Sequence, residues 1–125
     1  MRLSRKKQPP EISAYIGAGL KLEGELVFSG RIRFEGELSG RIRGESIVVG
    51  DTGVLKGEIQ AEEVVCFGKL EGIIRVRHLD LRSSGFVRGE IFTERLTVEE
   101  GARIEGTIKV EEGQIPVSGG VPEAP

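Results

Sequence analysis

The chain has 125 residues, of which 38% are hydrophobic and 30% are charged, and its net charge is −2. This balance indicates one folded soluble domain with short terminal segments, and it excludes a second catalytic domain and a membrane-spanning helix, which needs about 20 consecutive apolar residues. The single cysteine excludes an internal disulfide and a cysteine-based metal cluster, and the lack of a signal peptide predicts a cytoplasmic protein.

Residues 1–13 are predicted to form a disordered basic tail. The first ten residues carry four positive charges and no acid, so the other 115 residues must sum to −6. Basic and apolar side chains in this tail form a candidate membrane-binding segment for an anionic surface, with a solvated tail or a protein-binding tail as alternatives. The segment comprises Met1, Arg2, Leu3, Arg5, Lys6 and Lys7. The net acidic charge of the remaining chain disfavours nucleic acid as a partner.

Residues 14–110 contain an internal repeat. An apolar-x-Gly-x-apolar unit occurs six times, with spacings of 16, 17, 15, 17 and 17 residues between its central glycines. These glycines are Gly24, Gly40, Gly57, Gly72, Gly89 and Gly106. Between successive units lies a second apolar pair, namely Ile32 and Phe34, Ile47 and Val49, Val64 and Cys66, Leu79 and Leu81, or Leu96 and Val98. The repeat explains why glycine, at 19 residues, has about twice its usual share of roughly 7%.

The alternation of apolar and other residues over four or five positions predicts short β-strands, and no window has helical periodicity. Each repeat divides into three apolar segments, with glycine free to form the corners between them. We therefore predict an all-β, single-domain parallel β-helix of about six three-sided turns, whose dry core holds no polar side chain. The position before each repeat glycine would form an outward ladder, and its charge alternates through Lys56, Glu71, Arg88 and Glu105.

A β-helix leaves unpaired backbone N–H and C=O groups at both of its ends. Neither the basic tail nor residues 111–125, a second segment that is predicted to be disordered, offers a capping helix or a large apolar plug. Open ends favour end-to-end association of the chain with itself. The predicted polymerisation interface comprises Ile16, Leu20 and Leu22 at one end and Ile104, Ile108 and Val110 at the other.

The sequence predicts no catalytic, cofactor or metal site. Cys66 occupies an inward position of the repeat, which favours core packing over a reactive thiol. His78 is the only histidine, and no repeat carries the inserted loop that an acyltransferase cleft would need. The dispersed carboxylates lack metal-ligand spacing, and the Gly68-Lys69 pair lacks the following Ser or Thr of a phosphate loop. Four outward apolar residues form either lateral bundling patches or scattered surface positions: Val48, Val65, Ile73 and Phe92.

Three segments of the repeat region resemble the bactofilins, a family of bacterial cytoskeletal proteins. They read YIGAGLKLEGEL, RIRFEGELSGRIRG and GEIFTERLTVEEGARIEGTIKV. The resemblance covers residues 14–110 and implies a right-handed triangular β-helix that polymerises without nucleotide into filaments lacking polarity, bundles or sheets. It also implies a place on the inner face of the cytoplasmic membrane and a scaffolding role in cell shape, appendage growth, chromosome positioning or the placement of peptidoglycan enzymes.

One feature departs from this family pattern. Some members use an aromatic residue near the end of the β-helix at a junction, but this chain has none after Phe92, so Ile108, Val110 or Ile115 would serve instead.

The first hypothesis is a membrane-associated filament that needs no nucleotide and positions cell-shape or cell-wall factors. The alternative is a short β-helical platform that binds a cell-wall enzyme or another protein without extensive polymerisation. An enzyme of the β-helical acyltransferase kind is disfavoured by the isolated histidine.

Overall fold

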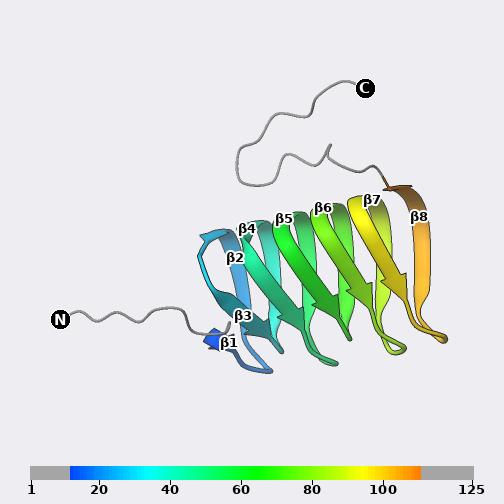
Figure 1. Cartoon of the computed structure of the whole chain (residues 1–125). Coiled ribbons are helices and arrows are strands. Elements are labelled where there is room, and N and C mark those ends of the chain that lie inside the picture. Colours follow the sequence, from blue (N-terminus) through cyan, green and yellow to red (C-terminus); the bar gives the residue numbers. More distant parts are fainter. Residues whose placement is uncertain (1–11, 111–125) are drawn as a thin grey trace, which may run out of the picture.

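The computed structural model describes residues 12–110, which form one parallel sheet wound into a β-solenoid of about six turns (Figure 1). These residues contain strands and no helix, so the predicted all-β fold is confirmed. The strands are β1 (Ile12–Ile16), β2 (Lys21–Val27), β3 (Arg31–Phe34), β4 (Glu37–Val49), β5 (Val54–Cys66), β6 (Lys69–Leu81), β7 (Phe86–Val98) and β8 (Arg103–Val110). Most of both predicted tails, residues 1–11 and 111–125, lies outside the described residues.

Each turn has three sides because the long strands bend around the core. The first part of β4 pairs with β2, and its last part, Ser46–Val49, pairs with β3. The first corner lies at Gly40, whose φ is 135°, and the second at Glu45, which the pairing register between β4 and β5 skips. The loop 50–53, between β4 and β5, makes the third corner. β5, β6 and β7 repeat this path at the same length of 13 residues.

The repeat glycines stack directly on one another, as the sequence predicts. The register pairs Gly24 with Gly40, and the same alignment continues through the four later repeat glycines. A Cβ atom built on Gly57 would collide with the carbonyl oxygen of Gly40, and the φ of Gly57 is 124°, a value that side chains rarely allow. Glycine at this corner therefore satisfies both the backbone conformation and the close approach of two turns.

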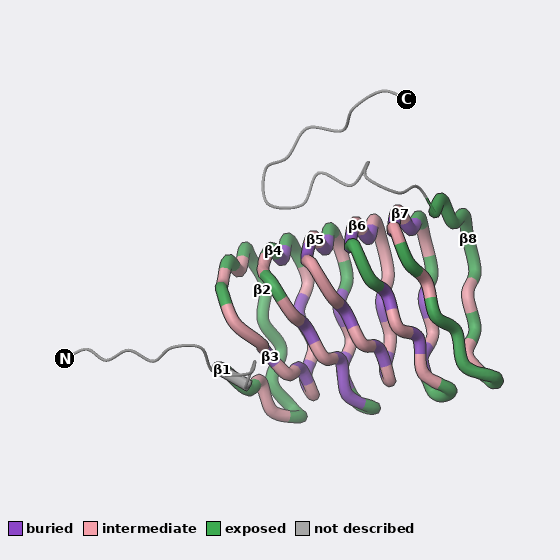
Figure 2. The backbone as a smooth tube through the Cα atoms, in the orientation of Figure 1, coloured by how far each residue is buried: buried purple, intermediate pink, exposed green. Residues whose placement is uncertain are grey.

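Inward positions form five columns along the axis of the rod. Figure 2 marks buried positions in purple along the backbone of the middle turns. The first two columns are Leu22, Leu38, Leu55, Leu70, Val87 and Ile104, and Leu26, Ile42, Ile59, Ile74, Ile91 and Ile108. The third contains Phe28, Gly44, Ala61, Val76, Thr93 and Val110. The fourth and fifth are Ala14, Ile32, Ile47, Val64, Leu79 and Leu96, and Ile16, Phe34, Val49, Cys66, Leu81 and Val98.

The third column corrects the prediction of a core without polar side chains. Thr93 is fully buried, and its hydroxyl lies 3.1 Å from the carbonyl oxygen of Arg77 and 3.0 Å from that of Arg95. A hydroxyl that donates to a backbone carbonyl avoids most of the cost of burying a polar group. Gly44, the second member of this column, has no side chain, and the ring of Phe28 fills the space where its Cβ would lie.

Loop length at the third corner sets the spacing of the repeat glycines from Gly40 onward, which is 15 residues across the short loop and 17 across the long ones. The loops after β3 and β5 have two residues each, 35–36 and 67–68, whereas the loops 50–53, 82–85 and 99–102 have four. Hydroxyl groups of longer loops then cover the shorter turns: Thr52 Oγ1 donates to the Glu35 carbonyl at 2.7 Å, and Ser84 Oγ donates to the Phe67 carbonyl at 2.8 Å. The same corner is therefore closed by hydrogen bonds despite its change of length.

A carboxylate reinforces the first of these corners. Arg33 Nε lies 2.7 Å from a carboxylate oxygen of Glu35, and the Thr52 hydroxyl lies 3.1 Å from the other. The hydrogen bond from Arg33 is the main cause that lowers the pKa of Glu35, and the bond from Thr52 adds to it, whereas partial burial opposes the change. The ionised form of Glu35 is thus the form that holds this corner.

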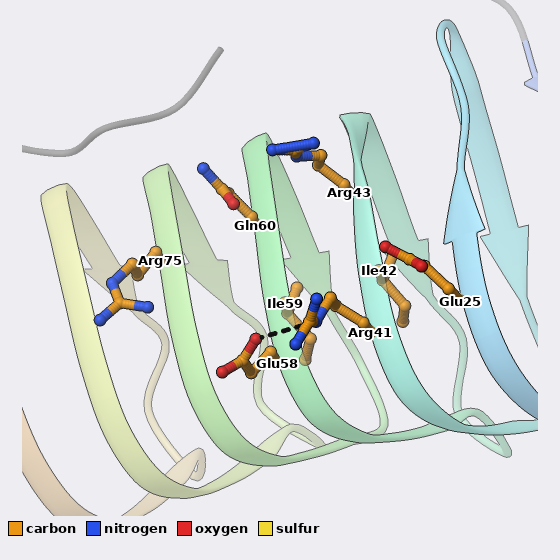
Figure 3. A pocket seen from close by; sticks show the side chains of 8 residues that line it. All are labelled: Glu25, Arg41, Ile42, Arg43, Glu58, Ile59, Gln60 and Arg75. Carbon is orange, nitrogen blue, oxygen red and sulfur yellow. Dashed lines mark ion pairs between the residues drawn. The ribbon is translucent and has the colours of Figure 1, made fainter. Parts of the chain in front are cut away.

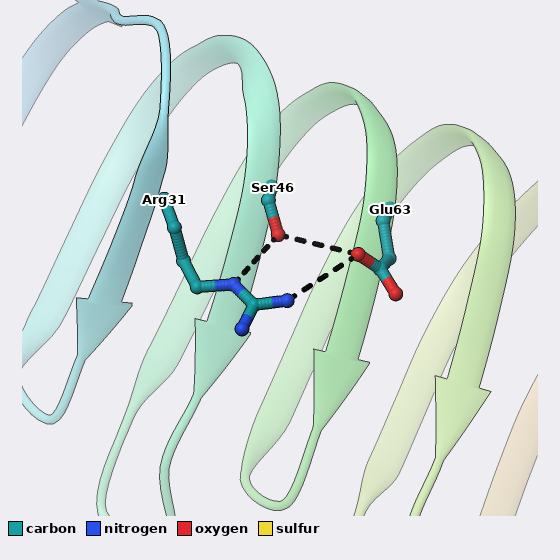
Figure 4. A network of polar contacts seen from close by, with 3 residues as sticks. All are labelled: Arg31, Ser46 and Glu63. Atoms are coloured by element: carbon teal, nitrogen blue, oxygen red, sulfur yellow. Dashed lines mark hydrogen bonds and ion pairs between the residues drawn. The ribbon is translucent and has the colours of Figure 1, made fainter. Parts of the chain in front are cut away.

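Polar ladders run along the outside of the rod. Arg88 lies 3.8 Å from Glu71 and 3.6 Å from Glu105, so part of the predicted charge alternation appears as ion pairs. In Figure 4, the Arg31 guanidinium contacts Ser46 at 3.1 Å and Glu63 at 3.5 Å across three neighbouring strands. Exposed pairs of this kind each contribute less than about 1 kcal/mol, so they assist the register that the core sets.

Alanine substitutions at two repeat glycines test the contact at the first corner. We expect Gly72→Ala to lower the free energy of unfolding clearly more than Gly24→Ala. Both residues have positive φ, which costs about 1–3 kcal/mol for alanine, but only a Cβ at Gly72 meets a neighbouring backbone. Urea denaturation followed by circular dichroism measures the difference, and equal losses in the two variants would show that the contact is unimportant.

Candidate assembly surfaces

Within residues 12–110, the apolar core is open at both ends of the rod. Every large hydrophobic side chain that is exposed within the described residues precedes Phe28 or follows Leu96. These are Tyr15, Leu20, Leu22, Val27, Val98, Ile108 and Val110. Leu22 and Ile108 are 37% and 38% exposed, whereas the hydrophobic column members in the middle of the rod are at most 4% exposed. The contrast between the exposed end strands and the buried interior is visible in Figure 2.

The N-terminal face is the end of the rod formed by Ile16, Leu22, Leu26 and Phe28. Each of these residues begins an inward column, and the half-buried Ile16, Leu26 and Phe28 also pack against the core. Leu20 lies at the rim of this face and is 50% exposed. Within the described residues, β1 pairs only with β3 and β2 only with β4, which leaves one edge of each strand without a backbone partner.

The C-terminal face is the opposite end, formed by Leu96, Val98, Ile104, Ile108 and Val110. These residues end the five inward columns. Within the described part of the chain, β8 pairs only with β7, so its outer edge also presents free N–H and C=O groups. Each end of the rod therefore combines an apolar surface with an open strand edge.

The structure brings the six predicted interface residues together in two groups at the two ends. Ile16 and Ile104 are half-buried against the core, whereas Leu20, Leu22, Ile108 and Val110 are exposed. The prediction omitted Leu26, Phe28, Leu96 and Val98, which complete the faces. Leu26, Leu96 and Val98 belong to the repeat itself, so the same periodicity contained the signal for all three. Phe28 lies outside the repeat pattern, and only its contact with Gly44 reveals its place.

The predicted membrane-binding residues, Met1, Arg2, Leu3, Arg5, Lys6 and Lys7, lie outside the described residues, as does Ile115. No helix among residues 12–110 is long and apolar enough to cross a bilayer. The same residues contain no group of three or more His, Cys, Asp or Glu side chains that could hold a metal ion. His78 is exposed on the outer surface.

Cys66 belongs to the fifth inward column, which confirms the prediction that it packs in the core. Its side chain is fully buried, and its Sγ atom lies 3.4 Å from the carbonyl oxygen of Gly68. Burial raises the pKa of the thiol to about 11, and the hydrogen bonds to backbone groups only partly oppose this shift. The reactive thiolate is thus scarce at neutral pH, and reagents in solution cannot reach it.

A groove of about 270 Å³ runs across the strands on one side of the rod (Figure 3). One bank presents Arg43, Gln60 and Arg75, which occupy equivalent positions of β4, β5 and β6. The other bank presents Glu25, Arg41 and Glu58, and Arg41 lies 3.2 Å from Glu58. The groove therefore separates a basic bank from one that carries two carboxylates.

A family model described as "Bactofilin: Polymer-forming cytoskeletal" matches residues 14–109. The match spans all of the repeat region apart from its last residue, Val110, and it includes the rest of both end faces. No curated protein and no solved structure matches the chain.

Thiol labelling tests the burial of Cys66. We expect the native protein to react with a thiol reagent at pH 8 far more slowly than the same protein in urea, because both burial and the raised pKa suppress attack by the thiolate. Absorbance at the wavelength of the released chromophore measures the rate. Reaction of the native protein at the rate of the unfolded chain would contradict the assignment of Cys66 to the core.

Proposed function

Since the chain belongs to the bactofilin family of polymer-forming cytoskeletal proteins, we propose that it assembles end to end into filaments that need no nucleotide. The observation that carries the proposal is the pair of open end faces. Each face exposes apolar members of columns that are sealed elsewhere in the rod. End-to-end contact would continue both the core and the sheet into the next subunit.

The size of the faces fits this role. Full burial of a large apolar side chain contributes about 1.5–3 kcal/mol, so covering four or five partly exposed residues on each partner contributes on the order of 10 kcal/mol. Association costs about 4–15 kcal/mol in lost translational and rotational freedom. Backbone hydrogen bonds along the open strand edges add about 1 kcal/mol each. The sum allows a stable junction, and its energy comes from burial and strand pairing, so no nucleotide hydrolysis is needed.

We place the filament at the inner face of the cytoplasmic membrane, attached through its basic tail. Four cations near an anionic surface contribute roughly 1 kcal/mol each, a weak attachment for one subunit. A filament presents many such tails together, and avidity makes the attachment strong. A membrane-bound polymer of this kind would position cell-shape or cell-wall factors along its length.

Charge placed on the C-terminal face tests the junction. We expect Ile108→Arg to give a folded, β-rich protein that no longer forms filaments, because the new charge would have to be buried without a partner at the contact. Negative-stain electron microscopy without nucleotide and with EDTA measures assembly, and circular dichroism measures folding.

Thr107→Arg is the matched control for this variant. It introduces the same charge one residue away, on the outer wall of the rod, and we expect it to polymerise. Filaments of normal length from Ile108→Arg would show that the C-terminal face is not a junction. A wild-type chain that stays monomeric would reject the polymer and favour the platform that binds a cell-wall enzyme or another protein.

Removal of residues 2–7 tests the membrane attachment. We expect the deletion to abolish binding to anionic vesicles and to leave polymerisation intact, because the segment carries all four cations of the tail. Removal of residues 117–122, which have the same length and no charge, is the control and retains binding. Co-sedimentation with vesicles measures the bound fraction, and unchanged binding after the first deletion would reject the tail as the anchor.

A further inference from the structure

One side of the rod carries two parallel rows of opposite charge. The acidic row is Glu25, Glu58 and Glu90, with Arg41 between the first two, and the cationic row is Arg43, Arg75 and Lys109. The rows occupy the outward positions on either side of the second inward column. They form the two banks of the groove in Figure 3 and extend beyond it to β8.

The charges alternate from one strand to the next along the rod. Acids lie on β2, β5 and β7, whereas the cations lie on the strands between and after them, β4, β6 and β8. The pattern therefore covers all six strands that form this side, at a strand spacing of about 4.8 Å.

Most of these side chains form no ion pair within residues 12–110. Of the six side chains, only Glu58 forms an ion pair there, with Arg41 at 3.2 Å. Arg75 and Lys109 lie instead over the ring of Phe92, at 5.2 Å and 5.8 Å from its centroid. Ile73, an outward and half-buried apolar residue, lies in the acidic row between Glu58 and Glu90.

We propose that this side is a self-association surface, on which a second copy of the chain packs side by side and in the same direction. A two-fold axis parallel to the rod places the cationic row of each copy opposite the acidic row of the other. Arg43 then faces Arg41 of the second copy at the level of β4, but Arg41 is already paired with Glu58, and Glu25 and Glu58 lie one strand to either side of Arg43. The level of Arg75 then falls between the levels of Glu58 and Glu90 of the second copy, about 4.8 Å from each, which is within reach of a long side chain. Such an arrangement uses one surface twice and is closed by symmetry.

The opposite direction of packing is disfavoured by the same charges. A two-fold axis perpendicular to the rod would set the cationic row against the cationic row and the acidic row against the acidic row, and close like charges repel each other. The parallel arrangement also covers Ile73 and Phe92, and the groove leaves room for the guanidinium groups that cross toward the acidic row.

The charge balance of this side disfavours a purely anionic partner. Arg41 and the cationic row give four positive charges, and the acidic row gives three negative charges, so the net charge is +1. A lipid surface or an anionic polymer would meet three carboxylates among the cations. A partner that carries both signs in alternation fits better, and the chain itself is such a partner.

Charge reversal of each row tests the pairing. The cationic-row variant carries R43E, R75E and K109E, and the acidic-row variant carries E25K, E58K and E90K. A control variant with K21E, K69E and R103E has the same net change as the first, on the adjoining side of the rod. Electron microscopy at low salt gives the fraction of filament length that runs as side-by-side pairs.

We expect the wild type and the control to form pairs, and each row variant to form single filaments only. Filaments of the two row variants, assembled separately and then mixed, should pair again, because one now presents two acidic rows and the other two cationic rows. Pairing that persists in both row variants, or a mixture that stays single, would overturn the proposal. Added salt should reduce the paired fraction of the wild type severalfold.

The proposed lateral pairing rests on the proposed filament only because a filament presents many copies of the surface together. The lateral surface and the end-to-end polymer can therefore be rejected separately. Single filaments in every sample would retain the end-to-end polymer and reject the lateral surface. If no sample forms filaments, sedimentation of the same proteins at high concentration tests the pairing directly. Dimers that are lost in each row variant and return in the mixture would support it, and a strictly monomeric wild type would reject it.

Discussion

The close approach of backbones at the glycine corner is the constraint on which the rest of this structure depends. Turn can stack on turn at about 4.8 Å only if no side chain stands between the repeat glycines. Their positive φ also makes the bend that separates the first side from the second. With the corner fixed, the residues two positions before and after each glycine point inward and meet their equivalents in the next turn. The first two columns of the core follow directly from this one contact.

A core built of columns has two ends, and residues 12–110 leave both of them uncovered. Each interior residue is covered by the turns before and after it, but the first and last members of each column have a neighbour on one side only. Leu22 and Ile108 are thus of the same apolar type as the other members of their columns, and they are exposed only because they lie at the ends. The proposed end-to-end assembly would therefore use the same kind of apolar contact that stabilises the fold. The outer wall is different, because its side chains are not needed for the core and are free to encode lateral recognition.

Much of this architecture could be predicted from the sequence because the same pattern of apolar residues and glycine recurs in every turn. Register, the burial of Cys66, the exposure of His78 and the position of the ends all follow from the apolar-x-Gly-x-apolar unit. The third column was not predicted because its members differ in size and polarity, and only their stacking makes them equivalent. They include Gly44, Ala61, Val76 and Thr93. Phe28 could not be placed, since the reason for its size is an absent side chain on the next turn. The paired rows of charge likewise become visible only once the turns are aligned.

The loops at the third corner differ in length, whereas the strands that they connect, β4 to β7, do not. From β4 to β7 every strand has 13 residues, and all variation in repeat length falls between strands. Insertions at this edge leave the columns in register, whereas an insertion inside a strand would turn every following side chain to the opposite face. The third corner is therefore an edge of the rod where a loop can be lengthened without disturbing the core. A polymer built this way can diversify its surface without altering its own periodicity.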